Sequence, residues 1–180
     1  MGSLVLAEHS DATVHAGSEQ YLTFLLDGRT YALGSLCVRE IIEYGQLTQV
    51  PMVSPAIRGV INLRGAVVPV IDLNVRFGRA PTDVNRRTCI IILEIADGED
   101  RHVLGVTVDA VSEVLDVPAE SIRPAPAFGS HIRTDFIRGM VRQGDEFVVL
   151  LIVEQTLSIQ ELSGAVAPHP TPNTPALAAP

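Results

Sequence analysis

The amino-acid sequence predicts a mainly β fold, arranged as barrels or as a sandwich. The apolar runs are short and frequent, turn residues separate them, and one group of residues recurs at a fixed offset. Many short strands joined by tight turns are typical of closed all-β architectures. A chain of 180 residues can form one substantial core, or two small barrels that share one.

Two hairpins are indicated by their turn residues. Tyr21–Leu26 and Arg29–Gly34 flank Asp27-Gly28, a pair that tolerates positive φ at both turn positions. Thr88–Ile95 and Val103–Val108 flank an Ala-Asp-Gly-Glu-Asp loop, which predicts a second hairpin. Both hairpins are expected to contribute strands to the core.

Two further strands are expected near a proline and near a turn. Val67–Ile71 contains Pro69, which cannot donate to a ladder, so this position should lie at an edge or a bulge. Glu146–Ile152 follows the turn Gln143–Asp145.

Three short segments are expected to be helical. Leu36–Tyr44 places apolar residues on one helical face, Asp72–Phe77 resembles a single turn, and Val153–Ser163 forms a C-terminal helix.

An internal echo links the two halves of this block. Ile57-Arg58-Gly59 recurs as Ile137-Arg138-Gly139, at an offset of 137 − 57 = 80 residues, and the echo continues without a gap into the next strands. A second echo relates Leu33-Gly34 to Leu104-Gly105. These echoes favour two similar barrels that arose by duplication. Chance similarity among valine-rich strands is the alternative.

The charge of the chain argues against nucleic acid and anionic membranes as partners. The formal net charge is −8, all thirteen basic residues are arginine, and the densest basic group is Arg86-Arg87. Phosphate backbones and anionic lipid surfaces require a concentrated basic face. The longest aliphatic run, Phe147–Val153, is far shorter than a membrane span, and no export signal is visible. A cytoplasmic location is expected.

The ordered block is expected to lie between two tails. Residues 1–18 lack periodicity and predict a flexible N-terminal tail, whereas residues 163–180 are rich in proline and alanine and predict a disordered one. The block spans residues 19–162, with a boundary between two pseudo-repeated subdomains near 80–88 and terminal strands that could cross between them. Cys37 and Cys89 are interpreted as small buried hydrophobic residues rather than a disulfide or metal site.

No recognised catalytic motif is present in the sequence. GxSxG, GxGxxG, P-loop and HExxH patterns are absent. Asp72 follows a strand and is better explained as the cap of a short helix than as a catalytic carboxylate. We therefore expect no enzymatic activity, no cofactor and no metal.

Several motifs resemble those of the CheW family of chemotaxis coupling proteins. The stretch from Gly59 to Leu73 contains Asn62-Leu63-Arg64-Gly65, and further matches are Val38–Ile41, Val108–Leu115 and Ile122–Pro126. Their order and spacing fit over about residues 19–162. Ala56 departs from the family, which often has an aromatic residue there.

The resemblance implies a fold and a function. The implied fold is two SH3-like five-stranded β-barrels around a shared aliphatic core, with short helices and a C-terminal helix. The implied function is that of an adaptor that joins the cytoplasmic tip of a methyl-accepting chemoreceptor to the regulatory domain of a CheA-type histidine kinase, in membrane-associated receptor arrays. An adaptor of another chemosensory pathway, such as type IV pilus motility, and a small-molecule-binding β-barrel are the alternatives.

The resemblance also implies a receptor-binding surface between the barrels. It places the receptor's helical hairpin against Val38, Glu40, Ile41, Asn62, Arg64 and Gly65. An apolar stripe with orienting charges suits such a helix, and a guanidinium can direct hydrogen bonds to carboxylates. Alternatively, Arg64 only braces its loop against Glu40, while Val38 and Ile41 are ordinary core residues.

The kinase-binding surface is expected on loops and strand ends of the first barrel. The candidates are Met52, Val53 and Val68, because an apolar pair flanked by prolines suits an exposed contact loop. Gly59, and Gly139 at the equivalent position, are expected to be structural glycines in tight turns.

Overall fold

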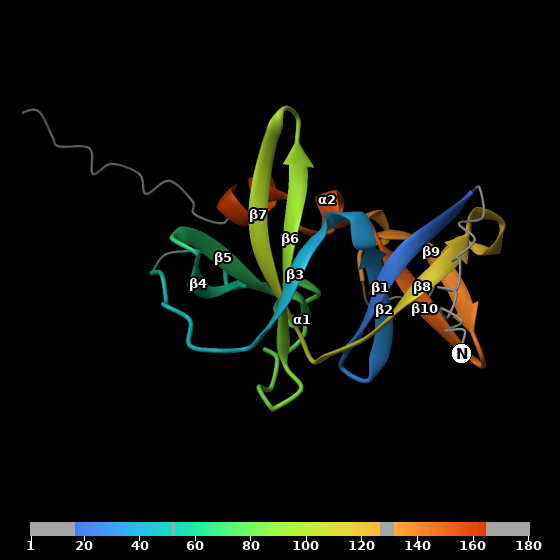
Figure 1. Ribbon diagram of the computed structural model, residues 1–180, viewed down its shortest axis with the longest axis horizontal. Coiled ribbons are helices and arrows are strands. Elements are labelled where there is room, and N and C mark those ends of the chain that lie inside the picture. Colours follow the sequence, from blue (N-terminus) through green and yellow to red (C-terminus); the bar gives the residue numbers. More distant parts are fainter. Residues whose placement is uncertain (1–16, 52, 127–131, 165–180) are drawn as a thin grey trace, which may run out of the picture.

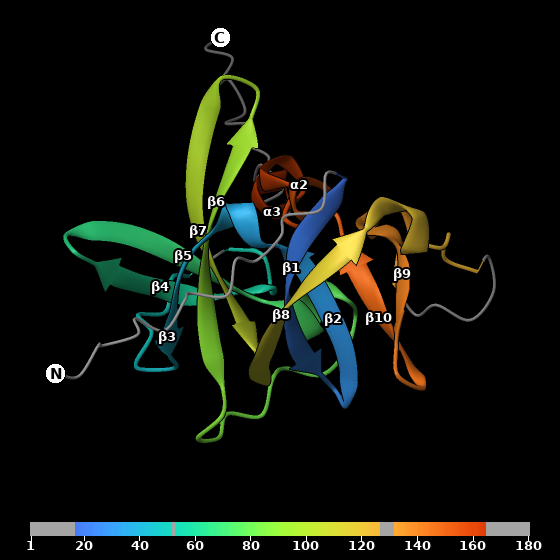
Figure 2. The same cartoon turned by 45° about the vertical axis from the view of Figure 1, so that its right-hand side comes forward.

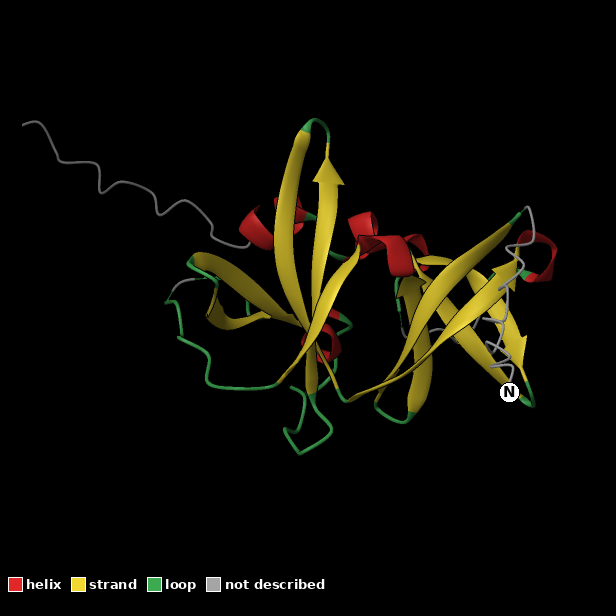
Figure 3. Cartoon of the chain, viewed as in Figure 1, coloured by secondary structure: helices red, strands yellow, loops and turns green. Residues whose placement is uncertain are grey.

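The computed structural model describes residues 17–51, 53–126 and 132–164, and within them the chain is dominated by strands (Figures 1 and 3). The strands are β1 (Ser18–Leu26), β2 (Arg29–Gly34), β3 (Val38–Glu43), β4 (Ile57–Leu63), β5 (Ala66–Asp72), β6 (Cys89–Asp97), β7 (Asp100–Val108), β8 (Ala110–Pro118), β9 (Ile137–Gln143) and β10 (Glu146–Leu151). The α-helices are α1 (Leu73–Arg76), α2 (Val153–Thr156) and α3 (Ile159–Gly164), and the 3₁₀ turns are η1 (Ser35–Cys37), η2 (Ala119–Ser121) and η3 (Thr134–Phe136).

The strands form two five-stranded sheets that lie side by side in Figure 1. Barrel I has the strand order β3-β6-β7-β5-β4, and barrel II has the order β8-β1-β2-β10-β9. The mainly β architecture of two SH3-like barrels that the sequence and the family resemblance predicted is therefore confirmed.

The two barrels exchange hairpins between the halves of the chain. Barrel I combines the β6–β7 hairpin of the second half with β3, β4 and β5 of the first. Barrel II combines the β1–β2 hairpin of the first half with β8, β9 and β10 of the second, so strands from both ends of the chain share one sheet (Figure 2). Neither half can close a barrel of this kind without the other.

The strand register supports the echo at an offset of 80 residues. In the parallel pairing of each barrel, Val70 lies opposite Gly105 and Leu150 lies opposite Ala32, and 150 − 70 = 80. Gly105 is therefore equivalent to Ala32, two residues away from Gly34. The second echo, Leu33-Gly34 with Leu104-Gly105, was out of register, because adjacent Leu and Gly residues recur by coincidence in two apolar strands.

The hairpin predictions are confirmed. Asp27 and Gly28 have φ of 48° and 73° between β1 and β2. The second hairpin closes at the pair Asp97 and Asp100, so its strands are longer than predicted. β7 pairs with β5 only from Val70 onward, so the missing donor of Pro69 interrupts no ladder on that side.

The predicted helix at Leu36–Tyr44 was wrong. The segment forms η1 and then β3, which pairs antiparallel with β6. Burial alternates along β3, with Ile41 exposed and Ile42 packed against the core of barrel I. The three apolar residues Val38, Ile41 and Ile42 fit a helical face, but the backbone partner offered by β6 determined the structure.

The helices predicted at Asp72–Phe77 and Val153–Ser163 are confirmed over part of each segment. Asp72 caps α1, as expected, by accepting the backbone N–H groups of Asn74 and Val75. The C-terminal helix is divided into α2 and α3 rather than continuous.

The core runs through both barrels. One cluster of buried side chains includes Phe24 and Tyr31 of barrel II together with Ile91 and Val106 of barrel I. It is mostly aliphatic, but a row of aromatic rings, Phe24–Tyr31–Phe77–Phe136, crosses it with centroid separations of 5.8–6.3 Å. Burying a continuous apolar cluster across both sheets opposes their separation.

Candidate functional site

Arg64 and Glu40, two of the six residues predicted to bind a receptor, meet at the surface of barrel I. Arg64, in the β4–β5 turn, donates from Nη1 and Nη2 to the two carboxylate oxygens of Glu40 on β3, at 2.8 and 3.0 Å. The Arg64 side chain is 77% exposed and that of Glu40 is 27% exposed. The pair is therefore a bidentate ion pair open to solvent, with the remaining guanidinium edge free to face a partner.

The turn that carries Arg64 has an unusual backbone for an arginine. Arg64 and Gly65 have φ of 51° and 87°. The Asn62 side chain stabilises this turn, because its Oδ1 accepts the backbone N–H of Gly65 at 2.8 Å. Gly, Asn or Asp would suit the first position better, since a left-handed backbone costs an arginine on the order of 1 kcal/mol.

Ile41 and Val38, the two apolar candidates on β3, differ in exposure. Ile41 is 42% exposed and lies one residue from Glu40, on the opposite face of the strand. Val38 is half-buried and packs against the core shared by the barrels. The interpretation of Val38 as a core residue is thus partly correct, whereas Ile41 is available to a partner.

The candidates for kinase binding are not brought together in the same way. Met52 lies outside the described residues, and Val53 is half-buried in the loop before β4. Val68 is 1% exposed and belongs to the core of barrel I, so its side chain cannot reach a partner. Strand alternation explains this, because its neighbour Val67 points outward and is 74% exposed.

Gly59 and Gly139 are required for close backbone approach rather than for turns. They lie within β4 and β9, where the next residues pair with Thr48 and Arg123 in isolated bridges. A Cβ on Gly59 would lie 2.6 Å from the Thr48 carbonyl oxygen, and one on Gly139 would lie 2.7 Å from the Arg123 carbonyl oxygen. The same close crossing therefore recurs in both barrels.

Asp72, the one carboxylate considered for catalysis, has a structural role. It is fully buried and accepts hydrogen bonds from the Arg58 guanidinium at 2.9 Å and from the Thr82 backbone N–H at 2.8 Å. With the capping bonds to α1 added, its oxygens are occupied by the protein. This arrangement holds α1 and the following loop in place.

The described residues contain no group of three or more His, Cys, Asp or Glu side chains arranged to hold a metal ion. Cys37 and Cys89 are free thiols, each partly buried. Within this part of the chain, no helix is long and apolar enough to span a bilayer.

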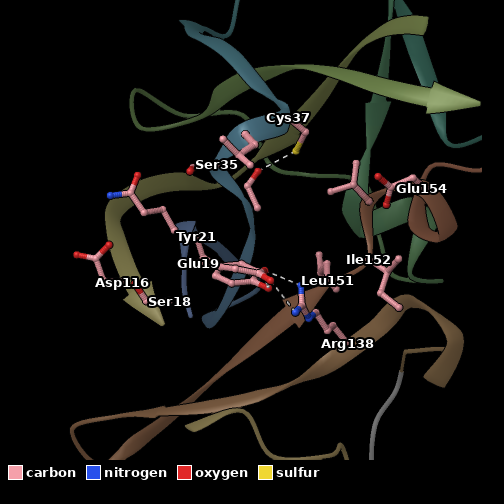
Figure 4. A pocket seen from close by; sticks show the side chains of 14 residues that line it. Ser18, Glu19, Tyr21, Ser35, Cys37, Asp116, Arg138, Leu151, Ile152 and Glu154 are labelled. Atoms are coloured by element: carbon pink, nitrogen blue, oxygen red, sulfur yellow. Dashed lines mark hydrogen bonds and ion pairs between the residues drawn. The ribbon is translucent and has the colours of Figure 1, made fainter. Parts of the chain in front are cut away.

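A hollow of about 480 Å³ opens on barrel II where the start of β1, η1, the end of β10 and the start of α2 meet (Figure 4). Its walls are largely apolar, and it holds the ion pair between Glu19 and Arg138, with N–O distances of 2.6 and 2.9 Å. The Arg138 guanidinium, by hydrogen bonding, holds the pKa of Glu19 below its usual value. The hollow is open and largely apolar and lies on barrel II, so it is not the large, deep polar cavity between the barrels that would favour a small-molecule-binding protein.

A fold of two interlocked barrels, with charged and apolar groups presented on open surfaces, defines a protein-binding scaffold. The model of the CheW family, described as a CheW-like domain, matches residues 20–175 of the chain. The chain is 36% identical to the chemotaxis protein CheW of Klebsiella aerogenes over 81% of its own length and 85% of that relative. It is 33% identical to the probable chemotaxis protein CheW of Rhizobium etli, over 85% of this chain and 96% of that one.

A solved structure agrees with the sequence relatives. The scaffolding protein TtCheW from Thermoanaerobacter tengcongensis superposes with a TM-score of 0.69 at 32% identity, covering 81% of this chain and 91% of that one. The chain belongs to the CheW family, and it is a chemotaxis adaptor.

Proposed function

We propose that this adaptor couples the cytoplasmic tip of a methyl-accepting chemoreceptor to the regulatory domain of a CheA-type histidine kinase, without catalysing a reaction. In this proposal the adaptor is cytoplasmic and is recruited to membrane-associated arrays by its partners. Family membership supports the role, and the exposed Arg64–Glu40 pair supports the position of the receptor contact.

The receptor contact is proposed to lie on barrel I around β3 and the β4–β5 turn. Ile41 supplies exposed apolar area, while Arg64 and Glu40 supply a cation and an anion at fixed positions. A receptor helix has polar edges, so it can exchange hydrogen bonds with the ion pair on the edge strand β3. Ile41, on the other face of that strand, offers apolar area to the second helix of the receptor hairpin. Asn62 and Gly65 set the backbone of the turn and so position Arg64.

One observation carries this assignment. Arg64 occupies a left-handed turn position at which the equivalent turn of barrel II has a glycine, Gly144. The turn itself gives no reason for an arginine, and the exposed bidentate pair contributes only about 0–1 kcal/mol to folding. A role in binding accounts for a residue that the local backbone disfavours.

The kinase contact is proposed to lie on the loop before β4, which includes Met52 and Val53. Val68 is retained only as a core residue that supports this part of barrel I. Affinities for either partner are expected to be modest, on the order of micromolar, because array stability comes from many linked contacts.

Reconstitution tests the proposal. The purified chain, a receptor-tip fragment and the kinase are mixed on vesicles, and kinase autophosphorylation and co-sedimentation are measured. The proposal predicts that the receptor fragment alters kinase activity and recruits kinase only when the chain is present. Receptor control of the kinase that is unchanged in its absence would contradict the coupling role.

A further inference from the structure

The hollow on barrel II is separate from the Glu40–Arg64 surface, since none of its lining residues belongs to the proposed receptor contact. Leu151, Ile152 and Val153 form part of its wall, at the junction of β10 and α2, and Tyr21 lines it as well. Figure 4 shows Tyr21, Leu151 and Ile152 among the side chains around the hollow. This apolar floor is continuous with the shared core through Leu151 and Val153. A side chain inserted here would contact a rigid surface.

Leu36 on η1 contributes an unusual apolar group to the rim. Its relative exposure is 102%, the largest among the large apolar side chains of the described residues. Burying a leucine completely stabilises a contact by about 1.5–3 kcal/mol. A fully exposed leucine next to an apolar hollow is suited to serve as an anchor for a bound segment.

The charge of the rim favours a basic partner. Glu19 is neutralised by Arg138, but Asp116 and Glu154 are exposed and make no ion pair within the described part of the chain. The hollow therefore carries two uncompensated carboxylates, on a chain whose formal net charge is −8. Such a field attracts cationic groups and disfavours anionic ones.

We propose that this groove is a second docking site, which binds a short segment of a partner protein that combines an aliphatic side chain with lysine or arginine. The aliphatic side chain packs between Leu36 and the Leu151–Val153 wall. The basic side chain faces Glu154, and a second basic side chain can face Asp116 on the opposite side of the hollow (Figure 4). The site binds independently of the Glu40–Arg64 surface.

A defined peptide pair tests the site. The probe is an acetylated 14-residue amphipathic peptide with leucines on one face and arginines beside them, and its counterpart has every arginine replaced by glutamate. Each is titrated into the ¹⁵N-labelled full chain. We expect the arginine peptide to shift the amide signals of Leu36, Cys37 and Glu154, with a Kd of roughly 0.1–1 mM, and the glutamate peptide to cause no localised shift.

Matched variants separate this site from general attraction to an acidic protein. Leu36→Ser and Glu154→Arg should each weaken peptide binding at least fivefold. Val67→Ser, which removes another exposed apolar side chain, and Glu99→Arg, at the β6–β7 turn, should change it less than twofold. All four changes are at exposed side chains, and unchanged melting temperatures would confirm folding.

Three results would overturn the proposal. The first is that the amide shifts are spread over the surface and do not include the residues of the hollow. The second is that the two peptides bind equally well, and the third is that Leu36→Ser binds the arginine peptide with wild-type affinity. Independence of the site is tested with the receptor-tip fragment, whose capture should be unaffected by Leu36→Ser. A loss of capture would show that the hollow is part of the receptor contact. That result would contradict a separate site but not the adaptor role.

Discussion

Arg64 in the β4–β5 turn and Gly144 in the β9–β10 turn occupy equivalent positions in the two halves of the chain, at an offset of 144 − 64 = 80, and both have positive φ, 51° and 62°. Both turns begin with a residue of positive φ, but their second residues differ, since Gly65 has a φ of 87° and Asp145 has no positive φ. Barrel I thus carries a guanidinium, paired with Glu40, where barrel II carries none.

Arg64→Gly should separate stability from binding. Glycine removes the cost of the left-handed backbone and also removes an exposed ion pair, so the free energy of unfolding should change by less than about 1 kcal/mol. Capture of the receptor-tip fragment should nevertheless fall at least tenfold. Urea unfolding and fragment binding, measured on the same preparation, check both parts. Gly144→Arg is the matched control, which should lower stability slightly and leave capture unchanged.

Gly59→Ala should destabilise the chain strongly. The new Cβ would lie 2.6 Å from the Thr48 carbonyl oxygen, so the backbone of barrel I would have to move. A cost of about 1–3 kcal/mol is expected from such overpacking. Gly45→Ala, where a Cβ meets nothing within 4 Å, is the control and should change the urea midpoint very little. Equal midpoints for the two variants would show that the crossing is not tight.

Asp72→Ala should be among the most damaging single substitutions. It removes the α1 cap and leaves the Arg58 guanidinium without its carboxylate at a largely buried position. Breaking a buried charge pair costs about 3–5 kcal/mol. Glu94→Ala, which breaks two exposed pairs with Arg39 and Arg101, should change the midpoint of the same urea assay far less. A similar loss for both variants would contradict a structural role specific to Asp72.

Tyr21 should titrate at unusually high pH. Burial, followed by the hydrogen bond to Glu19, raises its pKa from 10.0 to about 12. Between these values the folded chain keeps a proton that the unfolded chain has lost, so the free energy of unfolding falls as pH rises from about 10 to 12 and is unaffected by this group below that window. Subtracting the Tyr21→Phe titration at 295 nm from that of the wild type isolates the transition. A midpoint near 10 would contradict the burial of this hydroxyl.

The hairpins and the equivalence of β4–β5 with β9–β10 could be predicted because the sequence itself carries their signals. Asp27-Gly28 determines a turn through the conformational freedom of its own backbone, and the Ile-Arg-Gly repeat marks equivalent strands directly. β3 was mistaken for a helix because its few apolar residues fit both periodicities, and only pairing with β6 distinguishes the two.

The exchange of hairpins between barrels has no local signal. The echo relates the hairpin β4–β5 to the hairpin β9–β10. It does not indicate that β4–β5 will share a sheet with β6–β7 and that β9–β10 will share one with β1–β2. The sequence also could not predict which candidate residues are exposed, since Val67 and Val68 differ only in the face of β5 on which they lie. The left-handed backbone of Arg64 depends on turn length, which places Leu63 opposite Ala66.

The receptor contact is tested most directly by charge exchange at Glu40 and Arg64. Binding of the receptor-tip fragment is measured for Glu40→Arg, Arg64→Glu and the double variant, all checked for unchanged melting temperature. Direct recognition predicts that each single variant loses at least tenfold in affinity and that the double variant, although its internal pair is restored with reversed charges, stays weak. Wild-type affinity in the single variants, or its full recovery in the double variant, would show that Arg64 only braces its turn, and would contradict the proposed docking surface.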